Sequence, residues 1–266
     1  MKHVVLAVGL GIAGVLVFVQ PAWAAASVAP PIPVGVAPNE VTFSPDGTVA
    51  YSANSGSNDI SVIDVASGTT VGLPIPVDAQ PVSIAFVPNG SAAYVASNGG
   101  TVSVIDTASA LVTDTIAIAG ASFIEITPDG ATAYVASFGT NTVVPLDVAT
   151  GVAGTPIPVG SGPTGLAISP DGSRLYVANT WDGTVSAIDI ATNTVITQIA
   201  VGPRPFQLTV SPDNSEVWVA VGDINALAVI DAATLETVAT IAVGQNPRSV
   251  TISPDGTTAL AESYFD

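Results

Sequence analysis

The side chains that could carry chemistry in this sequence are almost all carboxylates. The chain has 21 Asp and Glu against 4 Lys and Arg, one His and no Cys. Its only Lys, His and Met are Lys2, His3 and Met1, so the chain beyond residue 24 contains none of the three. Catalysis through a His-activated Ser or Cys needs side chains that this remainder lacks, and so do zinc, copper and haem sites.

Two kinds of chemistry remain open to the carboxylates. Oxygen ligands can hold Ca²⁺, and two carboxyls can divide acid and base roles. Ten acids, however, stand where a carboxylate caps turn N–H groups, and no pair is singled out by spacing. The ten are Asp46, Asp129, Asp171, Asp213 and Asp255 after a proline, and Asp64, Asp106, Asp147, Asp189 and Asp231 after an apolar run. The sequence therefore predicts no catalytic residue and no cofactor, with Ca²⁺ as the alternative.

Cations are scarce enough to exclude whole classes of partner. The formal net charge is −17, and Arg174, Arg204 and Arg248 are the only basic side chains beyond residue 24. Nucleic-acid binding depends on basic residues that neutralise phosphates, so this chain should be repelled by nucleic acid. Anionic membrane surfaces are disfavoured for the same reason, and the lack of Cys means that an oxidising compartment is tolerated.

The first 24 residues are typical of a secretion signal. A short basic start precedes an uncharged apolar run, Val4–Val19, and an Ala-Trp-Ala site at 22–24. We expect cleavage after Ala24, with Ala26 as the alternative. The run is 16 residues long, short of the roughly 20 that a spanning helix needs, so an uncleaved anchor is less favoured. The sequence predicts a bacterial protein, secreted or held in the cell envelope, monomeric and not inserted in a membrane after cleavage.

An internal repeat of about 42 residues organises the rest of the chain. Pro-Asp-Gly-like turns recur 40 to 43 residues apart, at Pro45, Pro88, Pro128, Pro170, Pro212 and Pro254. The five strand-ending Asp residues, from Asp64 to Asp231, keep the same period. Two independent motifs in step indicate a repeat architecture.

Each repeat is predicted to form four strands. In the fourth, the strands are expected at 164–169, 174–179, 184–189 and 194–201, with turn residues between them. Short, evenly spaced strands without helical periodicity favour an all-β fold, a β-propeller of about six four-stranded blades. We expect a single domain, 25–266, with repeats that start near 34, 77, 119, 159, 201 and 243. The recurrent second-strand aromatics Tyr51, Tyr94, Tyr134, Tyr176 and Trp218 are predicted core residues.

The last blade is predicted to be incomplete. It has two strands, at 248–253 and 257–263, before the sequence stops. Upstream, residues 31–35 copy the fourth-strand sequence of 74–77, so we expect an N-terminal strand that joins the last blade. Either the propeller closes with a defective blade, or the chain is a shortened copy of a longer propeller.

The repeat resembles the YVTN family of β-propeller repeats, found in secreted and surface-layer-associated prokaryotic proteins. Tyr94–Ser97, Tyr134–Ser137 and Tyr176–Asn179 carry the resemblance, with the Pro-Asp-Gly turns and the Val-Gly-x-x-Pro segments that begin at Val159 and Val201. The resemblance implies the fold and not an activity, because roles within the family are diverse. Some six-bladed propeller lactonases are similar in holding Ca²⁺ with acid and amide ligands, so the alternative function is a Ca²⁺-dependent, lactonase-like hydrolase of the central channel.

One loop face of the predicted propeller collects residues that break the repeat. Loops between second and third strands share this face with loops that lead into first strands. The candidate ligand-binding residues there are Asn179, Trp181, Asp182, Phe138, Phe123, Arg204, Phe206 and Arg248. Variation confined to one face suits a binding surface, and Arg and Trp are enriched at binding hot spots. The alternatives are that Trp181 folds onto its own blade and that the Arg residues pair with nearby Asp. We expect non-catalytic recognition of an extracellular protein or glycan.

Overall fold

The computed structural model describes residues 7–8, 17–18 and 31–264. The predicted signal peptide lies outside the described residues, except for two short paired strands, β1 (Ala7–Val8) and β2 (Val17–Phe18). The chain divides into two compact units, residues 29–157 and residues 158–266 together with 1–28. In the described part of the chain no helix is long and apolar enough to cross a membrane.

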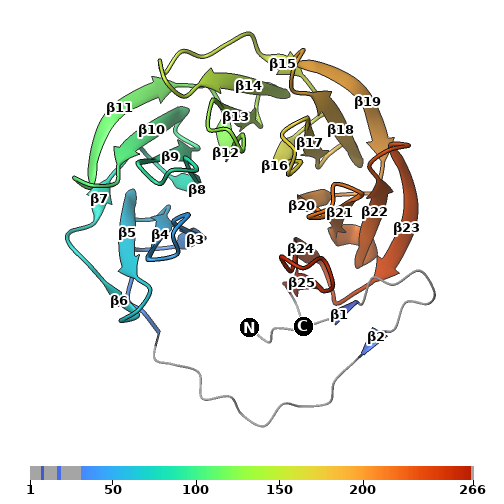
Figure 1. Ribbon diagram of the computed structural model, residues 1–266, viewed down its shortest axis with the longest axis horizontal. Coiled ribbons are helices and arrows are strands. Elements are labelled where there is room, and N and C mark those ends of the chain that lie inside the picture. Colours follow the sequence, from blue (N-terminus) through green and yellow to red (C-terminus); the bar gives the residue numbers. More distant parts are fainter. Residues whose placement is uncertain (1–6, 9–16, 19–30, 265–266) are drawn as a thin grey trace. The chain divides into compact units, whose positions relative to one another are not determined.

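The unit of residues 29–157 contains three antiparallel sheets (Figure 1). The first has β3 (Pro38–Phe43), β4 (Val49–Asn54) and β5 (Asp59–Asp64), and its outer edge is split into β6 (Thr69–Thr70) and β7 (Ile75–Pro76). The second has β8 (Pro81–Phe86), β9 (Ala92–Ser97), β10 (Thr101–Asp106) and β11 (Leu111–Ala117). The third has β12 (Ala121–Ile126), β13 (Thr132–Ser137), β14 (Thr142–Asp147) and β15 (Ile157–Pro158). The first strands β3 and β12 both contact β8.

The unit that contains residues 158–266 repeats this architecture. Its first sheet has β16 (Pro163–Ile168), β17 (Arg174–Asn179), β18 (Thr184–Asp189) and β19 (Thr194–Ala200). Its second has β20 (Pro205–Val210), β21 (Glu216–Val221), β22 (Ala226–Asp231) and β23 (Glu236–Ala242), with the 3₁₀ turn η1 (Gly222–Ile224) between β21 and β22. The last sheet has two strands, β24 (Pro247–Ile252) and β25 (Ala259–Ser263).

The predicted fold class, an all-β propeller of about six blades, is confirmed. Six up-and-down antiparallel sheets follow one another at the period of the repeat. In the fourth repeat, the observed strands differ from the predicted ones by one residue at most. The two-stranded last sheet also agrees with the prediction.

The structure differs from the prediction at the N-terminal segment. Residues 31–34 form no strand. A fourth strand must pair with a third one, and the described part of the last sheet ends with its second strand, β25. The copied Pro-Ile-Pro-Val sequence therefore has no strand there on which to form its hydrogen bonds.

The core lies between consecutive sheets of each unit. The five recurrent second-strand aromatics are at most 3% exposed, as predicted. Tyr51 meets Phe86 of the next sheet edge to face, with ring centroids 4.9 Å apart. Leu260, at the same repeat position in the last sheet, is 38% exposed.

The acidic turns fold as the sequence predicts. In the first repeat, Ser44 Oγ and the backbone N–H of Thr48 both donate to Asp46 Oδ1, at 2.6 and 3.0 Å. Gly47 then takes a φ of +69°. Asp189, after β18, accepts hydrogen bonds from the backbone N–H and the hydroxyl of Thr192, both at 2.8 Å. These bonds lower the pKa of the turn carboxyls, so the acids serve the fold as charged caps.

Candidate functional site

The predicted site residues fall in both compact units. Phe123, on β12, and Phe138, after β13, belong to the unit of residues 29–157, and both are partly buried. The other six belong to the second unit. Four of these six, Trp181, Arg204, Phe206 and Arg248, are brought together by contacts within that unit.

Asn179 does not belong to the exposed face. It ends β17 and is fully buried. Its Nδ2 donates to Thr184 Oγ1 at 3.0 Å and to Ser186 Oγ at 2.9 Å, both on the neighbouring strand β18. These bonds hold the end of the β17–β18 hairpin, so Asn179 has a structural role. The prediction that it contacts a ligand on the exposed face is wrong.

Trp181 and Asp182 lie at the tip of that hairpin. The Trp181 side chain is 64% exposed, although its indole lies over Gly162, where an added Cβ would come within 3.0 Å of the ring. Asp182 is exposed, and its Oδ2 accepts the N–H of Ser161 at 2.6 Å. The indole thus rests on the loop that leads into its own sheet, as the alternative expected, while most of the side chain stays exposed.

A depression of about 450 Å³ opens beside Trp181. Trp181 and Asp182 line it from one loop, and Pro203 and Arg204 line it from the loop before β20. Arg204 has a left-handed φ of +57° and pairs with Asp223 of η1 at 3.3 Å, both side chains being about half exposed. The loop before β20 thus places a cation at the edge of an aromatic platform.

Phe206 and Arg248 occupy the same repeat position, the second residue of β20 and of β24. In both sheets the register shifts beside this residue, between Pro205 and Leu208 and between Pro247 and Ser249. Such bulges re-aim side chains. The Arg248 guanidinium lies over the Phe206 ring, 4.0 Å from its centroid, and Arg204 approaches the same ring at 5.5 Å.

Two glycines allow Phe206 to take this place. A Cβ on Gly165 of β16 would collide with the backbone oxygen of Phe206, so the close approach of β20 requires glycine. A Cβ on Gly222 would lie 2.6 Å from Phe206 Cε2. The aromatic ring is therefore held from two neighbouring elements.

Arg248 is the least satisfied cation of the group. It also faces the Tyr264 ring at 5.7 Å, and its buried Nε has no hydrogen-bond acceptor among the described residues. Burial, and then the charge of Arg204, lower the pKa of Arg248. Two guanidiniums that share one aromatic ring can bind an anionic group with charge-assisted hydrogen bonds. We call Trp181, Arg204, Phe206 and Arg248 the arginine–aromatic surface.

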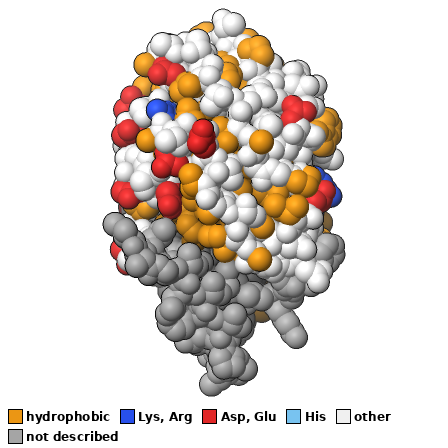
Figure 2. All heavy atoms as spheres, turned by 90° about the vertical axis from the view of Figure 1, so that its right-hand side faces the viewer, with side chains coloured by type: hydrophobic (Ala, Val, Ile, Leu, Met, Phe, Trp, Pro, Cys, Tyr) orange, Lys and Arg blue, Asp and Glu red, His pale blue; other side chains and the backbone are white. Residues whose placement is uncertain are grey.

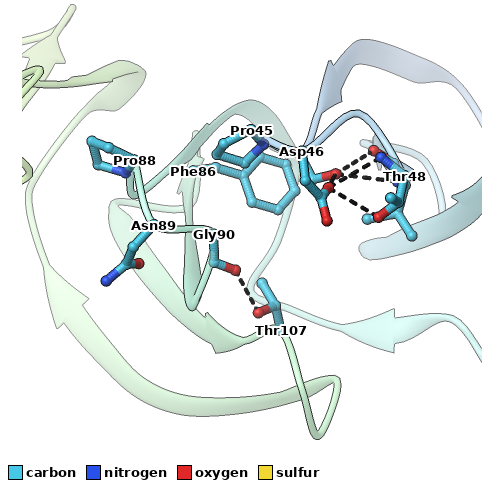
Figure 3. A pocket seen from close by; sticks show the side chains of 10 residues that line it. Pro45, Asp46, Thr48, Phe86, Pro88, Asn89, Gly90 and Thr107 are labelled. Atoms are coloured by element: carbon cyan, nitrogen blue, oxygen red, sulfur yellow. Dashed lines mark hydrogen bonds between the residues drawn. The ribbon is translucent and has the colours of Figure 1, made fainter.

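Cavities of similar size at the Pro-Asp turns have a different character. One of about 470 Å³ lies between the turns of the first two repeats (Figure 3). Its polar groups already bond one another: Asp46 accepts from Thr48, and the carbonyl of Gly90 accepts from the Thr107 hydroxyl at 2.6 Å. The corresponding cavity between Pro212 and Pro254, about 450 Å³, is lined by the same kind of turn. These two cavities recur because equivalent turns recur in neighbouring repeats.

Sequence reasoning missed a pair of carboxyls on the first strands of the other unit. Glu40 is on β3, Glu125 is on β12, and both are partly buried. Glu40 Oε2 accepts the N–H of Ile84 at 2.7 Å, and Ser83 Oγ accepts the N–H of Ile124 at 3.3 Å. Burial raises the pKa of Glu40 to about 7, and burial together with the charge of Glu40 raises the pKa of Glu125 to about 8.

Two carboxyls with different pKa values near neutrality can divide proton transfer between them. They do not by themselves supply the six to eight oxygen ligands of Ca²⁺, and the described residues contain no group of three or more His, Cys, Asp and Glu that could hold a metal. Aligning the repeats would have revealed both residues. Glu40 stands where the second repeat has Ser83, and Glu125 stands where it has Ala85.

The molecular surface elsewhere is acidic and mixed. Figure 2 views the side that bears the outer strands β19 and β23, where red carboxylates lie scattered and blue cations appear only in small, separate spots. Single apolar side chains such as Ile196 and Val238 are exposed on these strands. Isolated exposed apolar residues are ordinary, so this face suggests no site.

Comparison with known proteins agrees with this architecture. The chain is similar to the hydrazine synthase of Kuenenia stuttgartiensis, with a TM-score of 0.67 and 21% identity over 91% of this chain and 97% of that one. It is also similar to a functionally unknown protein from Desulfotomaculum acetoxidans, with a TM-score of 0.73 and 18% identity over 85% of this chain and 75% of that one. At these identities the likeness shows the fold alone. No curated protein matches the sequence.

Two family models match, and both describe β-propellers. The model of YNCE-like β-propellers matches residues 163–263. The model described as lactonase, 7-bladed β-propeller, matches residues 2–200, well over half of the chain. Its description names seven blades, whereas the repeats of the described residues form six sheets, apart from the short β1–β2 pair. The finer resemblance to the YVTN repeat stays a prediction. The chain belongs to the lactonase, 7-bladed β-propeller family.

Proposed function

We propose that this chain is a secreted, monomeric binding protein that recognises an extracellular protein or glycan through the arginine–aromatic surface. The observation that carries the proposal is the cluster itself. Arg204 and Trp181 line one depression, and Arg204 and Arg248 approach the same Phe206 ring. Of the three Arg beyond residue 24, only Arg174 lies elsewhere, where its Nη1 donates to the carbonyl of Ala232.

Placing these side chains on the surface costs free energy in the chain without a partner. Trp181 exposes 64% of its surface, and two cations stand close together. Exposed aromatic and Arg side chains on a held framework are the typical anchors of recognition, because they bring large contact area and directed hydrogen bonds. The polar groups that line the first turn-side cavity already bond to one another.

The test is a pull-down and a glycan array with the chain from residue 25, beside a Trp181→Ala, Arg204→Ala, Arg248→Ala variant. We expect the variant to lose the partners that the parent captures. A Leu73→Ala variant is the matched control, because Leu73 is 87% exposed and lies in the other unit. A triple variant that keeps every interaction of the parent would show that the binding surface is elsewhere.

Glu40 and Glu125 favour a second candidate, hydrolysis of a lactone or ester. The matched family carries lactonase in its description, and the two carboxyls have pKa values of about 7 and about 8. In such a reaction, ionised Glu40 takes a proton from the attacking water, and protonated Glu125 gives one to the leaving ring oxygen. Lactone and water yield the hydroxy acid, and the pair ends with its protons exchanged.

This candidate is tested with a panel of γ- and δ-lactones and aryl esters. Hydrolysis by the parent, lost in both Glu40→Gln and Glu125→Gln while the triple arginine–aromatic variant keeps it, would establish the hydrolase. Absence of turnover across the panel, or equal turnover in the Gln variants, would reject this role for the pair.

A further inference from the structure

We propose that Arg204 and Arg248 bind the carboxylate of an acidic sugar, a uronate residue of an extracellular glycan whose pyranose ring lies against Trp181. This inference rests on the proposed function and names its ligand class. The charge, the geometry and the shape of the arginine–aromatic surface support it.

The charges of the cluster do not balance. Arg204 has one acidic partner, Asp223, in the single ion pair formed by the described residues. Arg248 faces two aromatic rings, and within the part of the chain that the structure describes its buried Nε has no acceptor. Two neighbouring cations repel, and a chain with 21 acids and net charge −17 could have offset both. An anionic ligand at the guanidiniums would supply the missing charge.

The geometry suits a carboxylate. A guanidinium is a planar fork of N–H donors that matches the two oxygens of a carboxylate, and stacking on an aromatic ring leaves its edge available for such bonds. The ring of Phe206 holds Arg248 at 4.0 Å and Arg204 at 5.5 Å. Phe206 packs closely against Gly165 and Gly222, which helps to hold the ring that both guanidiniums approach.

The shape suits a sugar. The depression beside Arg204 has one exposed indole, that of Trp181, as its aromatic surface, and a pyranose ring can pack against such a flat face. Asp182 also lines it, and one of its oxygens accepts the N–H of Ser161. A carboxylate has about four acceptor positions, so Asp182 can also accept hydrogen bonds from sugar hydroxyls. Aromatic, acceptor and guanidinium together match a hydroxylated ring that carries one carboxylate.

The experiment titrates the chain from residue 25 by calorimetry with trimers of galacturonate, glucuronate and mannuronate, and with the neutral galactose, glucose and mannose trimers. We expect at least one uronate trimer to bind about tenfold or more tightly than its neutral counterpart. Arg204→Gln should weaken it about tenfold. Arg248→Lys, which keeps the charge and loses the fork, should weaken it as well. Asp223→Asn should tighten it, because it frees Arg204.

Arg248 is partly buried, so each variant is melted in parallel, and the exposed Arg204 keeps the test decisive if Arg248→Lys unfolds. Equal binding of acidic and neutral trimers, no binding of any uronate, or uronate binding unchanged in Arg204→Gln would overturn the inference. The proposed function fails separately, when a partner found by pull-down or array still binds the triple variant.

Discussion

Gly162 and Trp181 together determine how the candidate binding surface faces solvent. Gly162 has a φ of +66°, and a Cβ there would lie 3.0 to 3.2 Å from the Trp181 ring. The bare backbone of Gly162 thus forms the floor on which the indole rests while most of the ring faces solvent. No local pattern around Trp181 contains this information, because the contact comes from the loop before a neighbouring strand.

We predict that Gly162→Ala both destabilises the chain and displaces Trp181. The left-handed φ alone should cost about 1 kcal/mol. Gly47→Ala is the matched control, since Gly47 has a φ of +69° and nothing within 4 Å of an added Cβ. Urea unfolding and Trp emission check both effects. An emission spectrum that is the same in Gly162→Ala as in the parent would contradict the contact.

Asn179 shows how a polar residue at the end of a second strand can stabilise the hairpin and not the surface. Its amide bridges to Thr184 and Ser186 inside the hairpin. We predict that Asn179→Ala lowers the free energy of unfolding by about 1–3 kcal/mol, because buried hydroxyls lose their partner. Ligand affinity per folded molecule should stay within about twofold. An Asn179→Ala chain of parental stability would restore Asn179 as a surface candidate.

Turns are the elements that the sequence predicts best. Asp213 accepts hydrogen bonds from Ser211 Oγ, and from the N–H and Oγ of Ser215, at 2.6 to 3.0 Å. All three donors lie within two residues, so local chemistry decides the structure. The same holds for strand positions, which follow from turns at a fixed period.

We predict that Asp213→Ala costs about 1 kcal/mol at pH 7, in the range of a lost cap. Asp213→Asn keeps Oδ1 as an acceptor and should cost less. These bonds, the one from Ser211 first, lower the pKa of Asp213 to about 2. Their contribution is therefore present above pH 3.8 and is lost as the pH falls towards 2. Urea midpoints at pH 7 and pH 3 measure the difference, and equal midpoints for Ala and parent at pH 7 would contradict the cap.

The side chains of the first strands were the hardest to interpret from the sequence. Glu40 influences the charge of Glu125 from the other side of β8, an electrostatic interaction between the first and third repeats that no spacing within one repeat reveals. The bulges that aim Phe206 and Arg248 likewise depend on register between strands. The turns and the buried aromatics could be predicted because their partners recur in every repeat, whereas these side chains occur once each.

We predict that the chain loses stability as the pH rises. The folded pKa values of Glu40 and Glu125, about 7 and about 8, exceed the ordinary value of 4.5. Folding therefore favours their protonated forms, and this contribution is complete below pH 4.5 and is lost as the pH rises through 7 to 8. Urea unfolding at pH 5, 7 and 9 should show a fall on the order of 1–3 kcal/mol. Glu125→Gln should remove most of it, and an equally steep fall in that variant would contradict the pairing.

The molecule as a whole carries far more negative than positive charge. With a net charge of −17, its carboxylates repel one another, and salt screens that repulsion. We predict that raising NaCl from 10 mM to 0.5 M increases Tm by a few degrees. CaCl₂ at matched ionic strength should do no more, because the turn carboxylates are already committed to hydrogen bonds. A rise of many degrees with CaCl₂ alone would reveal a specific Ca²⁺ site and favour the hydrolase.

Tryptophan emission tests most directly whether the arginine–aromatic surface recognises an acidic glycan. Beyond residue 24 the chain has two Trp, the exposed Trp181 and the buried Trp218, so intrinsic emission reports on the surface directly. A titration of the chain from residue 25 with uronate trimers should give a saturable change in emission that weakens with added NaCl and is absent in Trp181→Ala. Emission unaffected by every trimer, or a saturable change that survives in Trp181→Ala, would contradict recognition of a glycan at the arginine–aromatic surface.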